Sequence, residues 1–346
     1  MKNIIKLAFL LPAIISCTKM KDLPPSDYIM EGGVFIVNEG NYRGGNGSLS
    51  FYSYDSSKIY NDLFSNINGR PLGDVPNAMA IKGDKAYIVV NNSGKIEVLD
   101  QATLKSAATI GGLISPRNIS FISDYKAYVS SLYSDSVTII NLQTNSISGY
   151  INIRRSSESI AVAGNKAFIS NWSGGKEIMV ISTFNDKVID SIEVGPEPES
   201  MAIDKNAKLW VLCDGGWTKQ NFAELDVINL ESDIVEKKFV FPTLQDSPSC
   251  LKIESTGQII YYLDNGVKQM DISSDKLPET TLIAESGASF YKIAINPVNN
   301  DIFITDAVDF VQQGWLLLYK NDGSFVMKQR AGIIPGSMCF KLTFSS

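Results

Sequence analysis

The side chains available for chemistry in this chain are carboxylates, amides, hydroxyls, thiols and aromatic rings, because its 346 residues include no histidine. Without imidazole the chain cannot build a Ser-His-Asp or Cys-His nucleophile or a histidine metal site, which removes most common hydrolytic chemistry. Four cysteines are too few for a disulfide scaffold, and no glycine-rich segment has the pattern of a phosphate-binding loop. We therefore predict a binding protein that is not an enzyme and needs no cofactor.

Carboxylates are the remaining candidates for holding a cation. The acidic residues that border short apolar runs are Glu39, Glu158, Glu199, Asp214, Asp264 and Asp306. Clustered carboxylates bind divalent cations, but the sequence contains no EF-hand-like spacing. We predict no metal site. The formal net charge of −6 and the lack of a Lys/Arg run also argue against a nucleic-acid partner.

A repeated unit positions these side chains. Each copy has a small residue or proline, two variable residues and an apolar run, followed by a turn and two further apolar runs. The copies begin at Pro76, Pro116, Ser157, Pro198, Pro248, Phe290 and Pro335. A period of about 40–45 residues with four short strands is typical of a β-propeller blade. Residues 32–346 divide into seven such units, so we predict an all-β, seven-bladed propeller with four antiparallel strands per blade.

The two ends of the repeat predict how the ring closes. Residues 33–38 (GVFIVN) begin at a second strand, and residues 335–344 (PGSMCFKLTF) form a first strand with no second strand after it. We expect the C-terminal strand to pair into the N-terminal blade, which removes open sheet edges.

Two polar rings are expected on one face of this propeller, because the start of strand one and the end of strand two meet there. The position after each repeat start is occupied by Asn77, Arg117, Glu158, Glu199, Ser249, Tyr291 and Gly336. The end of strand two is occupied by Asn38, Asn91, Ser131, Asn171, Asp214, Asp264 and Asp306. Turn capping explains any single Asn, Asp or Ser as well as binding does. For the whole face we favour binding, because the rings vary in charge while the strands stay uniform.

Loop lengths on this face predict where a ligand binds. Three connections after strand two are expanded, at residues 38–47, 214–224 and 306–314, and the first and last of these adjoin after ring closure. The expanded and shorter loops carry Tyr42, Arg43, Tyr133, Trp172, Trp217, Phe222 and Phe310. Aromatic rings beside amides and carboxylates suit a large amphipathic ligand or a protein partner. In contrast, we expect Trp210, Tyr87 and the thiols of Cys213, Cys250 and Cys339 to be buried.

The N-terminus resembles a lipoprotein signal. Lys2 and Lys6 precede an apolar stretch that ends at Ser16-Cys17, and this stretch is too short to span a membrane. We predict a signal peptide at 1–16, lipidation of Cys17, and a flexible tether over 17–31 ahead of one propeller domain at 32–346. A plain signal peptide is the alternative. The predicted location is the outer membrane, on the cell surface or on the periplasmic side.

The repeat itself resembles YncE-like propellers, whose units read Pro-x-x-apolar-Ala, then a Tyr-Val-x-Asn strand, then Val-x-Val-Ile-Asp. PESMAI, AYIVVNN and IEVLD carry the resemblance, and VFIVNEGNYRGGNGSLSFY is similar to a lipoprotein branch with BtuG-type surface proteins. This resemblance implies a seven-bladed fold. It also implies capture of a corrinoid such as vitamin B12 and its transfer to a TonB-dependent outer-membrane transporter.

Two other functions stay open from the sequence. The same face could serve as a protein-interaction scaffold in the envelope. A metal-dependent, lactonase-like enzyme is the least favoured alternative, because it would need a bound divalent ion. In each case the candidate residues on this face are Tyr42, Arg43, Asn77, Arg117, Tyr133, Glu158, Trp172, Glu199, Asp214, Trp217, Asp264, Tyr291, Asp306 and Phe310.

Overall fold

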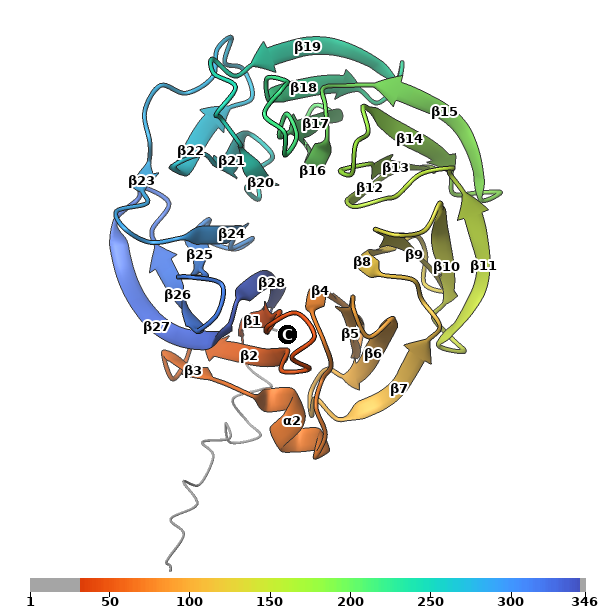
Figure 1. Ribbon diagram of the computed structural model, residues 1–346, viewed down its shortest axis with the longest axis vertical. Coiled ribbons are helices and arrows are strands. Elements are labelled where there is room, and N and C mark those ends of the chain that lie inside the picture. Colours follow the sequence, from red (N-terminus) through yellow and green to blue (C-terminus); the bar gives the residue numbers. More distant parts are fainter. Residues whose placement is uncertain (1–31, 343–346) are drawn as a thin grey trace, which may run out of the picture.

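Seven four-stranded antiparallel sheets form a closed ring around a central channel in the computed structural model, which describes residues 32–342 (Figure 1). This confirms the predicted all-β, seven-bladed propeller. The predicted signal peptide, Cys17 and the tether lie outside the described residues. Among the residues described, no helix has the length and apolar character needed to cross a membrane.

We number the blades along the chain from the first complete repeat and give their strands from the channel outwards. Blade 1 contains β4 (Pro76–Lys82), β5 (Lys85–Val90), β6 (Lys95–Asp100) and β7 (Ser106–Gly111), and blade 2 contains β8 (Pro116–Phe121), β9 (Lys126–Ser131), β10 (Ser136–Asn141) and β11 (Ser146–Asn152). Blade 3 contains β12 (Ile160–Ala163), β13 (Lys166–Ser170), β14 (Glu177–Ser182) and β15 (Lys187–Glu193), and blade 4 contains β16 (Pro198–Ile203), β17 (Lys208–Cys213), β18 (Glu224–Asn229) and β19 (Ile234–Val240). Blade 5 contains β20 (Ser249–Ile253), β21 (Ile259–Leu263), β22 (Gly266–Asp271) and β23 (Ile283–Ala284), and blade 6 contains β24 (Phe290–Ile295), β25 (Ile302–Asp306), β26 (Gln313–Tyr319) and β27 (Phe325–Ile333). Blade 7 contains β28 (Pro335–Lys341), β1 (Gly33–Asn38), β2 (Ser48–Ser53) and β3 (Lys58–Tyr60).

Blade 7 closes the ring as predicted. Its innermost strand, β28, comes from the C-terminus and pairs antiparallel with β1, so that Gly33 lies opposite Lys341 and Asn38 lies near Pro335. β28 also contacts the inner strands of blades 6 and 1. The two ends of the described chain therefore meet in one sheet, and the ring has no unpaired inner strand among the described residues.

The position of a strand in its blade explains its sequence. The second strands, such as β5 and β9, are buried along nearly their whole length, because neighbouring blades cover both faces. The fourth strands, such as β7 and β19, alternate between exposed and covered residues, as expected for an outer strand with one face in water. Trp210 and Tyr87 are buried as predicted, whereas Cys339 is only partly buried.

Two local features differ from the simple repeat. Blade 3 starts its inner strand at Ile160, three residues after Ser157. The segment before Ile160 still pairs with β13, because the Glu158 and Ser170 amides donate to backbone carbonyl oxygens across the two segments. A short helix, α2 (Leu63–Asn68), connects blade 7 to blade 1, and its Leu63 and Phe64 are buried against both blades. Six residues are too few to produce a helical hydrophobic period, so the sequence did not indicate α2.

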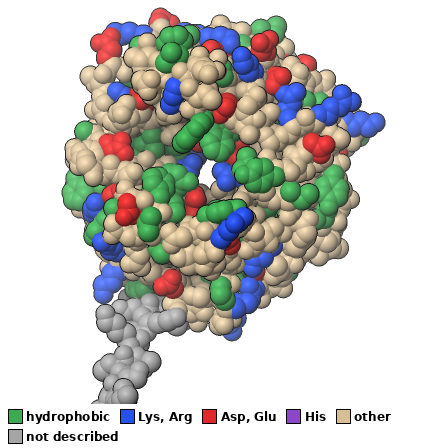
Figure 2. Space-filling model, viewed as in Figure 1, with side chains coloured by type: hydrophobic (Ala, Val, Ile, Leu, Met, Phe, Trp, Pro, Cys, Tyr) green, Lys and Arg blue, Asp and Glu red, His purple; other side chains and the backbone are tan. Residues whose placement is uncertain are grey.

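The propeller has two distinct faces, which we define by the ends of β1. The mouth face holds the Asn38 end of β1, the starts of the inner strands and the connections between second and third strands. The base face holds Gly32, where the described chain begins, and Leu342, where it ends. Figure 2 shows hydrophobic, basic and acidic side chains all bordering the central opening.

Candidate binding site

A polar cavity of about 110 Å³ lies in the channel, at the level where the inner strands begin. We call the residues that line it the floor of the mouth face. Five members of the first predicted ring line this cavity, namely Asn77, Arg117, Glu158, Glu199 and Tyr291. Ser249 and Gly336, the other two members of that ring, are not among the lining residues.

The floor also contains residues that the sequence analysis missed. Six of them occupy the next position of the same repeat, namely Asn118, Ser159, Ser200, Cys250, Lys292 and Ser337, and the seventh is Lys252, further along β20. The pairing of β24 with β25 shows why both positions line the channel: Phe290 is opposite Asp306, but Lys292 is already opposite Thr305, which leaves Tyr291 as an extra residue. Such a bulge breaks the strict alternation of a strand, so Tyr291 and Lys292 both line the channel. The polar character of this second column is the signal that could have identified it.

Arg117 and Glu158 form a two-pronged ion pair across blades 2 and 3. Arg117 donates from Nε to Glu158 Oε2 at 2.7 Å and from Nη2 to Glu158 Oε1 at 2.9 Å. Parallel hydrogen bonds of this kind fix both side chains in one orientation. Asn77 donates from Nδ2 to the Arg117 carbonyl oxygen at 2.7 Å, which ties blade 1 to the same pair.

Lys292 and Glu199 form a second, looser pair between blades 6 and 4. Lys292 Nζ lies 3.6 Å from Glu199 Oε1, and the Cys250 amide donates to Glu199 Oε2 at 2.9 Å. Burial alone would raise the pKa of Glu199, but Lys292 and the Cys250 amide hold it below its ordinary value. Burial alone would lower the pKa of Lys292, but Glu199 raises it, so Lys292 remains an ammonium.

Tyr291 connects the floor to the loop after β1. Its Oη donates to Glu39 Oε1 at 2.7 Å. Burial raises the pKa of Glu39, and the hydrogen bond from Tyr291 opposes that rise. A Cβ atom at Gly336 would lie 3.0 Å from Glu39 Oε1, so glycine at this position leaves Glu39 room beside the channel.

The second predicted ring mainly stabilises turns. Asn38 is fully buried and donates to Ser50 Oγ at 2.8 Å. Asp306 is almost fully buried, and its Oδ1 accepts from the amides of Ser289 and Val308, both at 2.9 Å. These contacts agree with turn capping, the other interpretation of this ring. They leave Asp306 little surface to offer a ligand.

Two further acidic residues of this ring are less enclosed. Asp214 accepts from the Gly216 amide at 2.8 Å and from Trp172 Nε1 at 2.9 Å. Burial raises the pKa of Asp214, although both hydrogen bonds oppose the rise. Asp264 is half-buried beside Asn265, and burial raises its pKa as well. Among residues 32–342, no group of three or more Asp, Glu or Cys side chains is arranged to hold a metal ion.

Exposed aromatic side chains surround the floor. Trp217 is 93% exposed, Tyr133 is 78% exposed and Tyr42 is 66% exposed. Phe310 is also exposed, while its ring meets Tyr291 edge-on at 5.3 Å. Exposing such large apolar surfaces is unfavourable in water, so a cluster of them around a polar centre indicates a recognition surface.

Apart from Tyr133, which follows β9 in blade 2, the aromatic side chains of this face form two groups on opposite sides of the channel. Blades 6 and 7 contribute Phe310 and Tyr42, and their expanded loops lie side by side, since Asn41 Nδ2 donates to the Val311 carbonyl oxygen at 3.2 Å. This contact confirms that the first and last expanded loops adjoin. Blades 3 and 4 contribute Trp172 and Trp217 across the ring (Figure 1). Arg43 stacks on Tyr42 at 5.2 Å, and its amide donates to Asp74, so it extends the first group.

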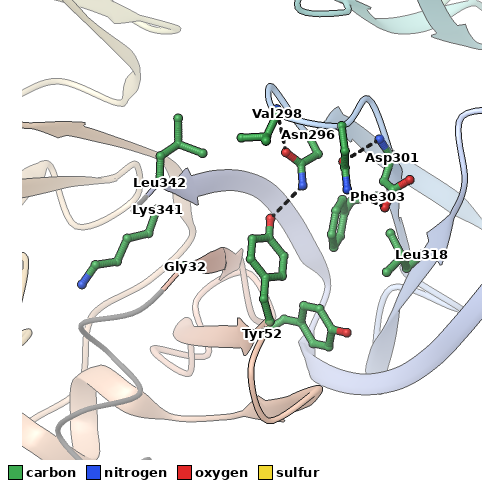
Figure 3. A pocket seen from close by; sticks show the side chains of 11 residues that line it. Gly32, Tyr52, Asn296, Val298, Asp301, Phe303, Leu318, Lys341 and Leu342 are labelled. Carbon is green, nitrogen blue, oxygen red and sulfur yellow. Dashed lines mark hydrogen bonds between the residues drawn. The ribbon is translucent and has the colours of Figure 1, made fainter. Parts of the chain in front are cut away.

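A larger cavity, of about 390 Å³, lies on the base face between blades 6 and 7 (Figure 3). Tyr52 and Phe303 line it, and both are almost fully buried in the packing of the two blades. Asn296 Nδ2 donates to Tyr54 Oη at 3.2 Å at its edge. None of the predicted site residues lines this cavity.

A closed ring of seven four-stranded blades with a polar channel mouth defines a β-propeller of the kind that serves as a scaffold for ligand binding or protein interaction. Within this class, the chain belongs to the family DUF5074, described as a domain of unknown function, which matches residues 32–329. No curated protein matches the sequence significantly.

Solved structures share the fold at low sequence identity. A quinonprotein alcohol dehydrogenase-like protein from Bacteroides thetaiotaomicron VPI-5482 has a TM-score of 0.69 and 16% identity, and covers 89% of this chain and 78% of its own. A functionally unknown protein from Desulfotomaculum acetoxidans DSM 771 has a TM-score of 0.69 and 14% identity, with 90% and 99% covered. A protein from Bacteroides fragilis NCTC 9343, provisionally named a 6-phosphogluconolactonase, has a TM-score of 0.64 and 11% identity, with 92% and 100% covered. At these identities the likeness shows the fold alone.

Proposed function

We propose that the protein binds a large amphipathic ligand on its mouth face and does so without catalysis. The observation that carries this proposal is the arrangement of that face, in which a floor of paired charges lies between two groups of aromatic rings that are exposed or half-buried. The floor cavity, at about 110 Å³, is too small for a large ligand. Such a ligand would therefore lie above the floor, with its apolar surfaces against the rings and its polar groups toward Arg117, Glu158 and Tyr291.

A corrinoid is the first ligand to test. The support is the resemblance of the repeat to BtuG-type proteins, together with the match between an amide-fringed macrocycle and a face of aromatic, amide and acidic side chains. Because the chain has no histidine, it cannot replace the lower ligand of cobalt through an imidazole. The protein would therefore contact the periphery of the corrinoid and leave the ligands of its cobalt unchanged.

Equilibrium titration with cobalamin and cobinamide tests this proposal. We expect saturable binding that Trp217→Ala weakens about ten-fold, since losing one stacked aromatic ring removes roughly 1–3 kcal/mol. Phe184→Ala is the matched control, because Phe184 is 90% exposed in the β14–β15 turn on the base face. Absence of binding at micromolar ligand would contradict the corrinoid assignment. Loss of a captured envelope protein in Trp217→Ala, without any ligand, would favour the scaffold alternative.

We also propose that the protein is anchored to the outer membrane through lipid on Cys17 and passes its ligand to a TonB-dependent transporter. The support within the described residues is that β1 begins beside Gly32 on the base face, the side of the propeller opposite the mouth face. Metabolic labelling with a palmitate analogue should mark the wild type but not Cys17→Ser. Equal labelling of both proteins would contradict the anchor.

A further inference from the structure

The carboxylates of the floor are engaged. Both oxygens of Glu158 accept from Arg117. Glu199 accepts from the Cys250 amide through one oxygen and faces Lys292 through the other. The second oxygen of Glu39 makes no hydrogen bond with a described residue, but Glu39 is not among the residues that line the cavity. The carboxylate oxygens that line the cavity are therefore already paired with donors of the protein.

Hydrogen-bond donors, in contrast, are left over. The nearest carboxylate oxygen to Lys292 Nζ is 3.6 Å away, which is longer than a hydrogen bond. Lys252 lines the same cavity and forms no ion pair with any residue in the range 32–342. Arg117 uses Nε and Nη2 on Glu158, which leaves Nη1 without a partner among these residues. Ser337 Oγ is buried and has no hydrogen-bond partner within residues 32–342.

We propose that the floor is an oxyanion site, which takes a carboxylate or phosphate group of the ligand between Lys292, Lys252 and Arg117. Ionised oxygens form the strongest hydrogen bonds with ammonium and guanidinium donors, and they would supply the charged acceptors for the unpaired donors of the floor. The identity of the rest of the ligand rests on the proposed function, but the anion site stands on the floor residues alone.

The dimensions of the cavity agree with a small group. Its volume of about 110 Å³ corresponds to three or four water molecules at about 30 Å³ each, which is the space for one carboxylate or phosphate group. The high pKa of Lys292 keeps it charged throughout the physiological range. The Arg117–Glu158 pair forms one rigid side of the site, and the loose Lys292–Glu199 pair lets Lys292 turn toward an incoming anion.

Calorimetric titration of the intact protein with inorganic phosphate and with succinate tests the site, and methylammonium chloride at equal ionic strength serves as the cation control. We expect saturable binding of at least one anion and none of methylammonium. Lys292→Met should weaken anion binding roughly ten- to hundred-fold, as expected for the loss of a charge-assisted hydrogen bond. Lys252→Met should weaken it in the same direction, and because Lys252 is exposed, this variant tests the site even where Lys292→Met does not fold. Comparing phosphate with succinate tells which of the two groups the site prefers.

Lys187→Met is the matched control, since Lys187 is exposed on the outer strand β15, away from the channel. Equal weakening in Lys187→Met would assign the binding to general surface charge and overturn the site. Absence of saturable binding of either anion at millimolar concentration would overturn it as well. The cobalamin titration is independent: anion binding without corrinoid binding would contradict the proposed ligand only, and the reverse result would contradict the oxyanion site only.

Discussion

Asp226 should make the stability of the propeller depend on pH. This residue is fully buried in β18, where Oδ2 accepts from the Gly195 amide at 2.8 Å and Oδ1 has no partner in the described part of the chain. Burial raises the pKa of Asp226 to about 6, although the Gly195 amide and Lys238 oppose the rise. A carboxyl group whose pKa is higher in the folded state than in the unfolded chain is a source of instability once it ionises.

The size of the effect follows from the two pKa values. Against an ordinary value of 3.8, a folded pKa of about 6 corresponds to about 3 kcal/mol of lost stability above pH 7, at about 1.4 kcal/mol per pKa unit. The loss develops as pH rises from about 4 through 6, and it is absent in acid, where both states hold the proton. Asp226→Asn removes the ionisation and so escapes this loss. The free energy of unfolding of the variant minus that of the wild type should therefore be about 2 kcal/mol lower at pH 4 than at pH 8.

Urea unfolding at pH 4, 6 and 8 and constant ionic strength measures this difference. Asp190→Asn, at an exposed aspartate on β15, controls for the removal of one negative charge. Comparing pH values within one variant separates ionisation from the lost contact with Lys238, which lies 3.4 Å from Asp226 Oδ2. If the difference between Asp226→Asn and the wild type is the same at pH 4 and pH 8, the assignment of the titrating group is refuted.

Three further predictions concern the blades. Burial alone would raise the pKa of Glu97, but hydrogen bonds from Arg70 and Lys95 lower it to about 2. The ionised group therefore stabilises the fold above about pH 4.5, and that stability is lost as pH falls toward 2. Glu97→Gln should show a smaller decrease in thermal midpoint between pH 6 and pH 3 than the wild type, and an equal decrease would contradict the pairing. Removal of β28 (Pro335–Lys341) should abolish the single cooperative melting transition, because blade 7 loses its innermost strand. An unchanged melting curve would mean that the ring does not depend on this closure. Gly33→Ala should cost several kcal/mol in the free energy of unfolding, since its Cβ would lie 2.3 Å from both the Phe51 ring and the Tyr52 carbonyl oxygen. Denaturant unfolding measures this loss, and a value under about 1 kcal/mol would contradict the tight packing around Gly33.

The contrast between Glu97 and Asp226 illustrates what the sequence can and cannot predict. Both are the third residue of the third strand of a blade, in β6 and β18. The repeat predicts a third strand at each place, but it does not indicate that the acidic residue is buried. The opposite pKa shifts depend on Lys95 and on Arg70, which comes from the connection after blade 7 and bonds to Glu97 but not to Asp226. A repeat alignment does not contain that contact.

The same limit applies to the binding site. The period and the unmatched end strands were enough to predict seven blades, their closure and five of the floor residues. Lys292 was missed because strict alternation of a strand would direct Tyr291 and Lys292 to opposite sides, and only the bulge in β24 places both at the channel. Asp306 was predicted to face a ligand, but the amides that it accepts from belong to turns whose shape the sequence does not define.

The position of β1 determines how the propeller carries a mechanical load. A force applied to the chain before Gly32 acts along β1, which is paired antiparallel with β28 on one side and β2 on the other. Because the hydrogen bonds of such pairs run perpendicular to the strands, the force shears both ladders at once instead of opening them one bond at a time. A domain pulled from this end therefore resists extraction through two strand pairings at once, while the force does not pass through the loops of the mouth face.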